Sequence, residues 1–161
     1  MSSKSTSGFS FINTIFKTMK RFFAILAALV SLPFLSTADD HAIPFAQLPQ
    51  TSQTFVQTHF KGVNVVLAMR DFDSYEVRFE DGTEIEFDRS GNWKEIDCKY
   101  KAVPASVVKL IPAGIKTYVS SNFPQAEINQ VNVKRWGYEV ELNNGLELDF
   151  NKNGGFLRMD D

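Results

Sequence analysis

An internal repeat is the feature that most constrains how this chain folds. When the sequence is shifted by 63 residues without a gap, residues 48–97 align with residues 111–160, and twelve of these 50 positions are identical. Self-similarity at a fixed interval predicts copies of one supersecondary unit that pack against each other. We therefore place two copies, at about residues 43–99 and 103–161.

Each copy begins with a helical pattern. In the second copy, apolar residues recur at three- and four-residue spacing from Val107 to Phe123, and Pro104 suits a first helical turn. Pro112 interrupts this run, and Pro49 stands at the matching place in the first copy. Because proline breaks the helical hydrogen-bond pattern, we expect either a helix with a break or two short helices in each copy.

The pattern then changes to the alternation that is typical of strands. The alternating segments are residues 75–79, 84–88, 138–142 and 146–150. Asp81-Gly82 separates the first two segments, and Asn144-Gly145 separates the second two. Such pairs favour a type I′ hairpin turn, in which both central residues have positive φ. Further strands are expected over Val63–Arg70, Trp93–Lys99, Ile128–Arg135 and Phe156–Asp160.

These patterns together predict an α+β fold. Each of the two tandem repeats would be a single or broken helix followed by a four-stranded antiparallel meander. The meanders would combine into a curved sheet with the helices on one face. The other face would be open to solvent, as is common for antiparallel sheets.

Residues 1–38 have the pattern of a secretory signal peptide. A positive segment with Lys17, Lys20 and Arg21 precedes an apolar stretch of 14 residues, Phe22–Leu35, and small residues follow it up to Ala38. This predicts export with cleavage after Ala38. The apolar stretch is too short for a membrane span, which needs about 20 residues, so no stable anchor is expected after cleavage. Translation starts at Met1 or at Met19, which would itself begin a conventional signal peptide.

Cleavage would also change the charge of the protein. The whole chain has 17 basic and 19 acidic residues and a net charge of −2. No acidic residue precedes Asp39, so the mature chain of residues 39–161 keeps 13 basic and 19 acidic residues, a net charge of −6. An acidic product argues against binding to nucleic acid, which requires clustered Lys and Arg.

Several segments resemble a known family. They are Tyr75-Glu76-Val77, Gly82, Ile85-Glu86-Phe87-Asp88 and Gly91-Asn92-Trp93-Lys94-Glu95-Ile96-Asp97 in the first copy, and Gly137-Tyr138-Glu139-Val140, Leu148-Asp149-Phe150, Gly154 and Asp160 in the second. Together with the signal peptide they are similar to the PepSY-like proteins, which are secreted and similar in architecture to the β-lactamase-inhibitor protein. The resemblance covers about Ile43–Asp161. It implies tandem repeats that form an eight-stranded surface and, by analogy with PepSY domains, the binding or inhibition of a protein such as a peptidase.

The alternation also places acidic side chains together on the solvent face. The candidate partner-binding residues are Glu76, Arg78, Glu84, Glu86, Glu139, Glu141, Glu147, Asp149 and Trp93. An acidic face would steer a basic partner towards it. The alternative is an ordinary solvated face whose charges keep the protein soluble. An exposed Trp93 would be a binding anchor, whereas a buried one would belong to the core.

One motif suggests a different function. Asp149-x-Asn151-x-Asn153-Gly154, followed after five residues by Asp160, matches the spacing of a calcium-binding loop. Such a loop lies between two helices, whereas residues 146–150 alternate as a strand. A calcium- or small-ligand-binding envelope protein is therefore kept as the alternative.

The chain has few residues that would support catalysis. It contains no Ser/His/Asp or Cys/His arrangement and no phosphate-binding loop. The single cysteine, Cys98, is interpreted as a small apolar filler, since only His41 and His59 are available as bases. We expect a monomeric, periplasmic or extracellular binding module without catalytic activity, cofactor or metal, whose partner is an unidentified protein or peptide of the cell envelope.

Overall fold

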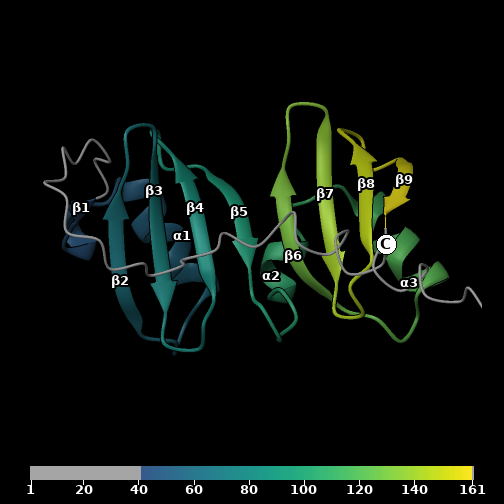
Figure 1. Ribbon diagram of the computed structural model, residues 1–161, viewed down its shortest axis with the longest axis horizontal. Helices are drawn as coiled ribbons and strands as arrows, with labels where there is room; N and C mark the ends of the chain where they lie inside the picture. The colour runs from purple at the N-terminus through teal and green to yellow at the C-terminus, as the bar shows by residue number, and fades with distance from the viewer. Residues whose placement is uncertain (1–40, 161) are drawn as a thin grey trace, which may run out of the picture. The chain divides into compact units, whose positions relative to one another are not determined.

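The computed structural model describes residues 41–160 of the chain (Figure 1). The predicted signal peptide and its cleavage site lie outside the described residues. In chain order the elements are β1 (His41–Ala42), η1 (Phe45–Gln47), α1 (Gln50–His59), β2 (Val65–Arg70), β3 (Ser74–Phe79), β4 (Glu84–Asp88), β5 (Trp93–Asp97), α2 (Ala105–Val108), α3 (Ala113–Asn122), β6 (Ile128–Val133), β7 (Gly137–Leu142), β8 (Glu147–Asn151) and β9 (Phe156–Asp160).

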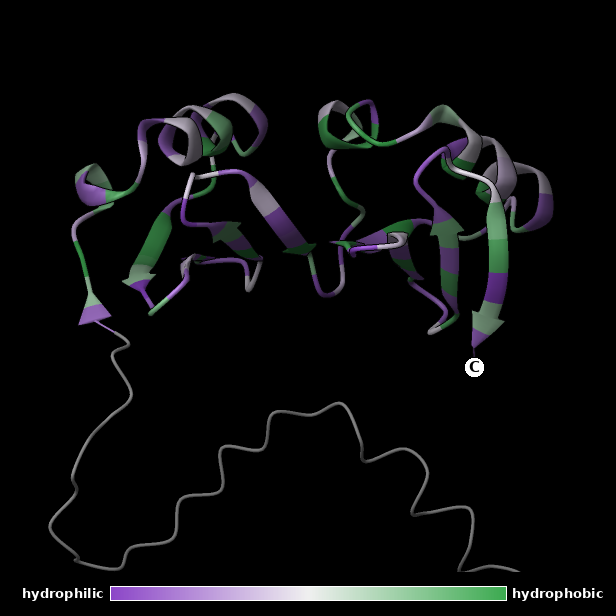
Figure 2. Cartoon of the chain, turned by 90° about the horizontal axis from the view of Figure 1, so that it is seen from above, coloured by the Kyte–Doolittle hydropathy of each residue, from purple (hydrophilic) through white to green (hydrophobic). Residues whose placement is uncertain are grey.

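Proline residues set where the short helices begin. Pro49, Pro104 and Pro112 immediately precede α1, α2 and α3, and each has an extended ψ between 132° and 141°. A helix cannot continue through such a residue, so η1 ends before α1 and α2 ends before α3. The helical segments in Figure 2 are accordingly short.

The described strands all belong to one antiparallel sheet, in the order β1 to β9. In its centre β5 pairs with β6, with Ile96 opposite Val131. The predicted arrangement of two four-stranded meanders with helices on one face is wrong, because the structure has a single nine-stranded sheet that includes β1 and only a few short helices, although the fold is α+β in the broad sense. The last strand of a meander leaves an edge of unpaired backbone groups, and here β6 pairs with that edge. Alternation identifies strands but does not tell which edges pair.

The hairpin turns also differ from the prediction. Gly82 and Gly145 both have a φ of +85°, but the residues before them do not have positive φ, so neither turn is type I′. In the first turn, the Gly82 N–H donates to the Phe79 carbonyl over 3.0 Å and the Phe79 N–H donates to the Thr83 carbonyl over 2.9 Å. This pattern is a type I turn followed by a glycine bulge.

The core consists of the apolar residues that alternate along the strands together with apolar residues of the helical segments, and Figure 2 shows the alternation along the strands in colour. Phe55 of α1 packs edge-on against Phe87 of β4, with ring centroids 5.8 Å apart. Tyr118 of α3 makes the corresponding contact with Phe150 of β8, at 5.5 Å. The strand residues between the buried ones therefore project from the opposite, polar face of the sheet.

Several irregularities recur at an interval of 63 residues. The strand register shifts between Val65 and Leu67 and between Ile128 and Gln130, and again between Glu86 and Phe87 and between Asp149 and Phe150. A β-bulge adds one residue to a strand and changes which face the following side chains occupy. The proposed repeat would account for this recurrence, because two copies of one unit carry the same bulges.

Candidate functional site

The candidate site is a double row of polar side chains on the sheet face opposite the core. The register of β3 to β9 aligns one side chain from each strand in each row. The first row contains Glu76, Glu86, Glu95, Asn132, Glu139, Asp149 and Arg158. The second row contains Arg78, Glu84, Asp97, Gln130, Glu141, Glu147 and Asp160.

The double row contains every predicted site residue except Trp93. The indole of Trp93 stacks on Phe55 of α1, with ring centroids 6.3 Å apart, and Trp93 lies opposite the buried Phe87. Trp93 is therefore on the core side of the sheet, and the structure does not bring it to the acidic face.

Sequence reasoning missed Glu95 and Asp97, which lie in the middle of the double row. Simple alternation assigns both to the same face as Trp93. The register shift in the β4–β5 pair leaves Lys94 as an extra residue, so the side chains after it change faces. The available signal was apolar Ile96, which is buried and requires its two neighbours to point to the polar face.

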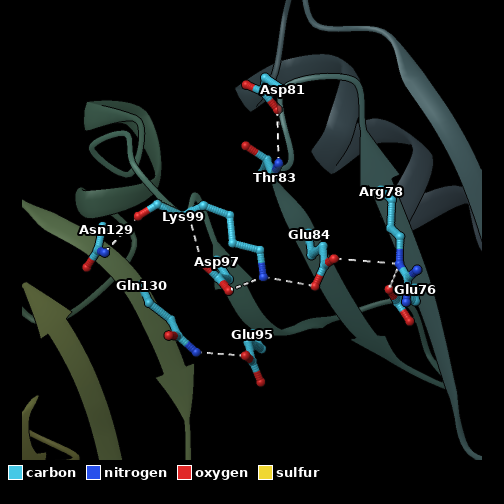
Figure 3. A network of polar contacts seen from close by, with 10 residues as sticks. All are labelled: Glu76, Arg78, Asp81, Thr83, Glu84, Glu95, Asp97, Lys99, Asn129 and Gln130. Atoms are coloured by element: carbon cyan, nitrogen blue, oxygen red, sulfur yellow. Dashed lines mark hydrogen bonds and ion pairs between the residues drawn. The ribbon is translucent and has the colours of Figure 1, made fainter. Parts of the chain in front are cut away.

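Two cations offset part of the acidic charge at β3 to β5. The Lys99 ammonium lies 2.6 Å from an Asp97 oxygen and 3.2 Å from a Glu84 oxygen (Figure 3). Burial opposes the charged form of Lys99, but these two carboxylates prevail and raise its pKa. Arg78 forms ion pairs with Glu76 and Glu84. The second row is therefore largely compensated on these strands.

The first row is less well compensated there. Glu86 lies directly opposite Glu76 on one side and Glu95 on the other. Desolvation is the main cause that raises the pKa of Glu86, and the charges of Asp73 and Glu76 add to it. Desolvation and the Glu86 charge likewise raise the pKa of Glu95. The side chain of Glu95 accepts a 2.7 Å hydrogen bond from the Gln130 amide.

The part of the first row on β6 to β9 is more closed. Asp149 is 6% exposed and lies 2.5 Å from the Arg158 guanidinium. Glu139 accepts a hydrogen bond from the Asn132 amide at 3.1 Å and lies 3.3 Å from the Lys134 ammonium. Within the first row, the carboxylate most accessible to a partner is consequently that of Glu86, which is exposed.

The calcium-like motif forms a hairpin turn rather than a loop between helices. The Asn151 side-chain oxygen accepts hydrogen bonds from the backbone N–H groups of Asn153, at 2.9 Å, and Gly155, at 3.0 Å. Asp88 makes equivalent bonds with Ser90 and Asn92. These oxygens close turns, as Asx side chains commonly do. Across residues 41–160, no three or more His, Cys, Asp or Glu side chains are grouped closely enough to hold a metal ion.

The remaining reactive side chains are not arranged for covalent chemistry. Cys98 is buried, and burial raises the pKa of its thiol to about 11, so the nucleophilic thiolate is disfavoured. Burial lowers the pKa of His59, whose ring packs on Phe55 at 4.6 Å. Within the described part of the chain, no helix is long and apolar enough to cross a bilayer.

Comparison with known proteins identifies a family with the same pattern. The model of a family described as "Putative beta-lactamase-inhibitor-like, PepSY-like" matches residues 73–158, more than half of the chain. This match confirms the resemblance inferred from the sequence. No curated protein sequence matches the chain.

Three solved structures with the same fold are of proteins from Bacteroides species. A "putative calcium-regulated periplasmic protein" from Bacteroides thetaiotaomicron is 40% identical, with a TM-score of 0.71 over 76% of this chain and 98% of its own. A "putative periplasmic protein" from Bacteroides vulgatus is also 40% identical, with a TM-score of 0.72 over 78% of this chain and 100% of its own. A second protein from that species, described as being of unknown function, is 36% identical, with a TM-score of 0.70 over 76% of this chain and 99% of its own.

Proposed function

The chain belongs to the PepSY-like family, and from this premise we propose that it is an exported binding module that captures a basic protein or peptide through the double row. The module has no catalytic role of its own. The family is described as inhibitor-like, so the partner would be a protein, such as a peptidase, whose activity is restrained by binding.

The proposed compartment is the periplasm. Three relatives with 36–40% identity to this chain are described as periplasmic proteins. Residues 1–38 have the pattern of an export signal, and cleavage after Ala38 would release an acidic chain. A soluble acidic module in this compartment attracts basic partners over distances of about 10 Å at moderate ionic strength.

The observation that carries the proposal is the direct opposition of like charges across neighbouring strands. Glu76, Glu86 and Glu95 follow one another in the first row. Directly opposed like charges destabilise a sheet, whereas opposite charges that face each other across strands stabilise it by about 0.2–1 kcal/mol per pair. A face that served only solubility would not need this arrangement, and a basic partner would relieve the repulsion.

Calcium regulation, named in the description of one relative, is not part of the proposal. Two of the side chains that the motif would offer to a cation already have partners within the chain. Asp149 is paired with Arg158, and the Asn151 side-chain oxygen closes a turn.

Affinity capture from the envelope of the exporting cell tests the proposal. The immobilised protein is compared with the variant E86K/E147K, which reverses one charge of the double row in each half of the sheet. The matched control, E80K/E127K, makes the same change of net charge at exposed residues outside the two rows.

We expect the control to retain the captured partner and E86K/E147K to lose it. Capture by the unchanged protein should also weaken as salt is raised, because exposed charges are screened. Equal capture by all three forms would contradict the role of the double row. Loss with both variants would indicate an effect of net charge rather than of this face.

A further inference from the structure

The outer edge of β9 is an open sheet edge within the described residues. The sheet order ends at β9, and all five residues of this strand are exposed. Apolar Leu157 is 52% exposed and Met159 is 49% exposed. A strand edge with unpaired backbone groups and exposed apolar side chains readily pairs with another strand.

The sheet itself contains a precedent for such pairing. Ile96 of β5 precedes Met159 by 63 residues, and β5 pairs on its outer side with β6. There Ile96 is completely buried, and the Cys98 N–H donates to the Asn129 carbonyl over 2.9 Å. Because backbone groups alternate along antiparallel strands, Ile96 also directs its N–H and C=O towards β6. By the same alternation, the backbone groups of Met159 face the open edge of β9.

The charges of β9 are complementary to those of a second copy of the same strand. We propose that β9 pairs antiparallel with β9 of a second copy of this chain about a two-fold axis, with Met159 opposite Met159 of the partner subunit. This register places Arg158 opposite Asp160 of the partner subunit, and Asp160 opposite Arg158 of the partner subunit. Opposite charges that face each other across strands stabilise the pairing, and the two methionines cover each other.

The far edge of the sheet explains why the assembly closes at two copies. There β1 pairs with β2, with Ala42 opposite Met69, and the Ile43 N–H donates to the Ala68 carbonyl over 2.9 Å. β1 thus covers one end of the β2 edge, and β1 itself is only two residues long, so β9 offers the longer open edge within residues 41–160. A two-fold contact that uses the same edge of both subunits is closed and does not propagate into a filament. This dimer differs from the monomer expected from the sequence.

Sedimentation velocity over a range of protein concentrations tests the pairing, using the protein as processed on export. The unchanged protein should show a reversible dimer. Asp160→Arg places two arginines opposite each other on both sides of the axis and should weaken dimerisation by about tenfold or more. The double variant R158D/D160R reverses both charges together and should restore the affinity to within about threefold of the original.

Met159→Pro gives an independent test because it removes the outward N–H from the edge. Proline is tolerated at such positions of edge strands, so thermal unfolding should show a folded protein, while the dimer should be lost. If Met159→Pro does not fold, the two charge variants alone test the pairing of β9 with β9 of the partner subunit. A monomer at every concentration, a dimer indifferent to Asp160→Arg, or a double variant as weak as Asp160→Arg would each overturn the proposal.

Discussion

Glu86 is the residue at which recognition and stability conflict most directly. Its carboxylate lies between two others in the first row, and desolvation followed by the charges of Asp73 and Glu76 raises its pKa. A carboxyl group whose pKa is raised by folding destabilises the native state when it ionises. The penalty is absent well below the ordinary pKa of 4.5, grows as the pH rises above this value, and is complete above the folded-state pKa.

Glu86→Gln should therefore stabilise the protein at pH 7 by about 0.5 kcal/mol, the usual size of one cross-strand charge interaction. The gain should vanish at pH 4, where the carboxyl group of the unchanged protein is neutral. Urea unfolding at the two pH values measures both effects. Glu127→Gln, at an exposed position outside the rows, serves as the control. A loss of stability at pH 7 would show that Glu86 has a favourable partner in the native state.

Cys98 should behave as a buried apolar residue. Its side chain is 3% exposed, and its raised pKa of about 11 leaves almost no thiolate at neutral pH. We expect Ellman's reagent to label the thiol only after denaturant unfolds the chain. Rapid labelling of the native protein, at a rate independent of denaturant, would contradict this prediction and would reopen the possibility of a reactive thiol.

The residues around β5 show how far alternation predicts a site. Glu76 and Glu84 lie in uninterrupted strand segments, and alternation assigns both to the polar face. Trp93 and Glu95 have the same parity but lie on opposite faces, since Lys94 is the extra residue of a bulge. A bulge is a matter of pairing with the neighbouring strand, so residue order within β5 alone does not reveal it.

Among the elements, the turn between β4 and β5 packs closely against helix α1. Gly91 has a φ of +84°, and the Ser52 hydroxyl of α1 donates to its carbonyl over 3.2 Å. A Cβ atom at Gly91 would lie 2.7 Å from Pro49 Cβ and 2.9 Å from Ser52 Oγ. This glycine is needed both for its backbone conformation and for the close approach of α1.

Gly91→Ala should therefore cost at least about 3 kcal/mol of unfolding free energy, from the clash together with the positive φ. Gly145→Ala is the matched control, because Gly145 has a φ of +85° but a Cβ atom at this position would meet no neighbouring side chain or backbone within 4 Å. It should cost only about 1–2 kcal/mol, the penalty of the backbone conformation. Chemical denaturation measures both, and equal costs would show that α1 can move away from the turn.

Local chemistry predicts elements better than it predicts turn type. Pro49 and Pro112 divide the helical segments where the sequence indicated a break. The Asp81-Gly82 turn was predicted as type I′ and is instead a type I turn with a glycine bulge. Both turn types place glycine at a positive φ. They differ in the φ of the residue before the glycine, and aspartate is compatible with either conformation.

At the scale of the whole molecule, the contact between β5 and β6 turns two strand groups into one sheet. It pairs Glu95, Ile96 and Asp97 with Asn132, Val131 and Gln130. The amides of Gln130 and Asn132 separate the acidic side chains of β5 from those of β7. This central position for neutral amides limits repulsion where the two groups meet, and it extends the double row across the sheet.

The same contact predicts that the two halves unfold together. Ile96→Ala removes a fully buried side chain opposite Val131 and should cost about 2–4 kcal/mol. Met159→Ala, at the exposed position 63 residues later, is the control and should change stability by no more than about 0.5 kcal/mol.

Trp93 and Trp136 lie in different halves of the sheet. When one of them is replaced by phenylalanine, the fluorescence of the remaining tryptophan reports on the unfolding of its own half. In one cooperative sheet, Ile96→Ala lowers the urea midpoint of both fluorescence signals equally, because loss of either half exposes the edge on which the other packs. The measurement is made at protein concentrations well below those that favour dimers. A midpoint shift confined to the Trp93 signal would show that the halves are separate folding units joined only by hydrogen bonds between β5 and β6.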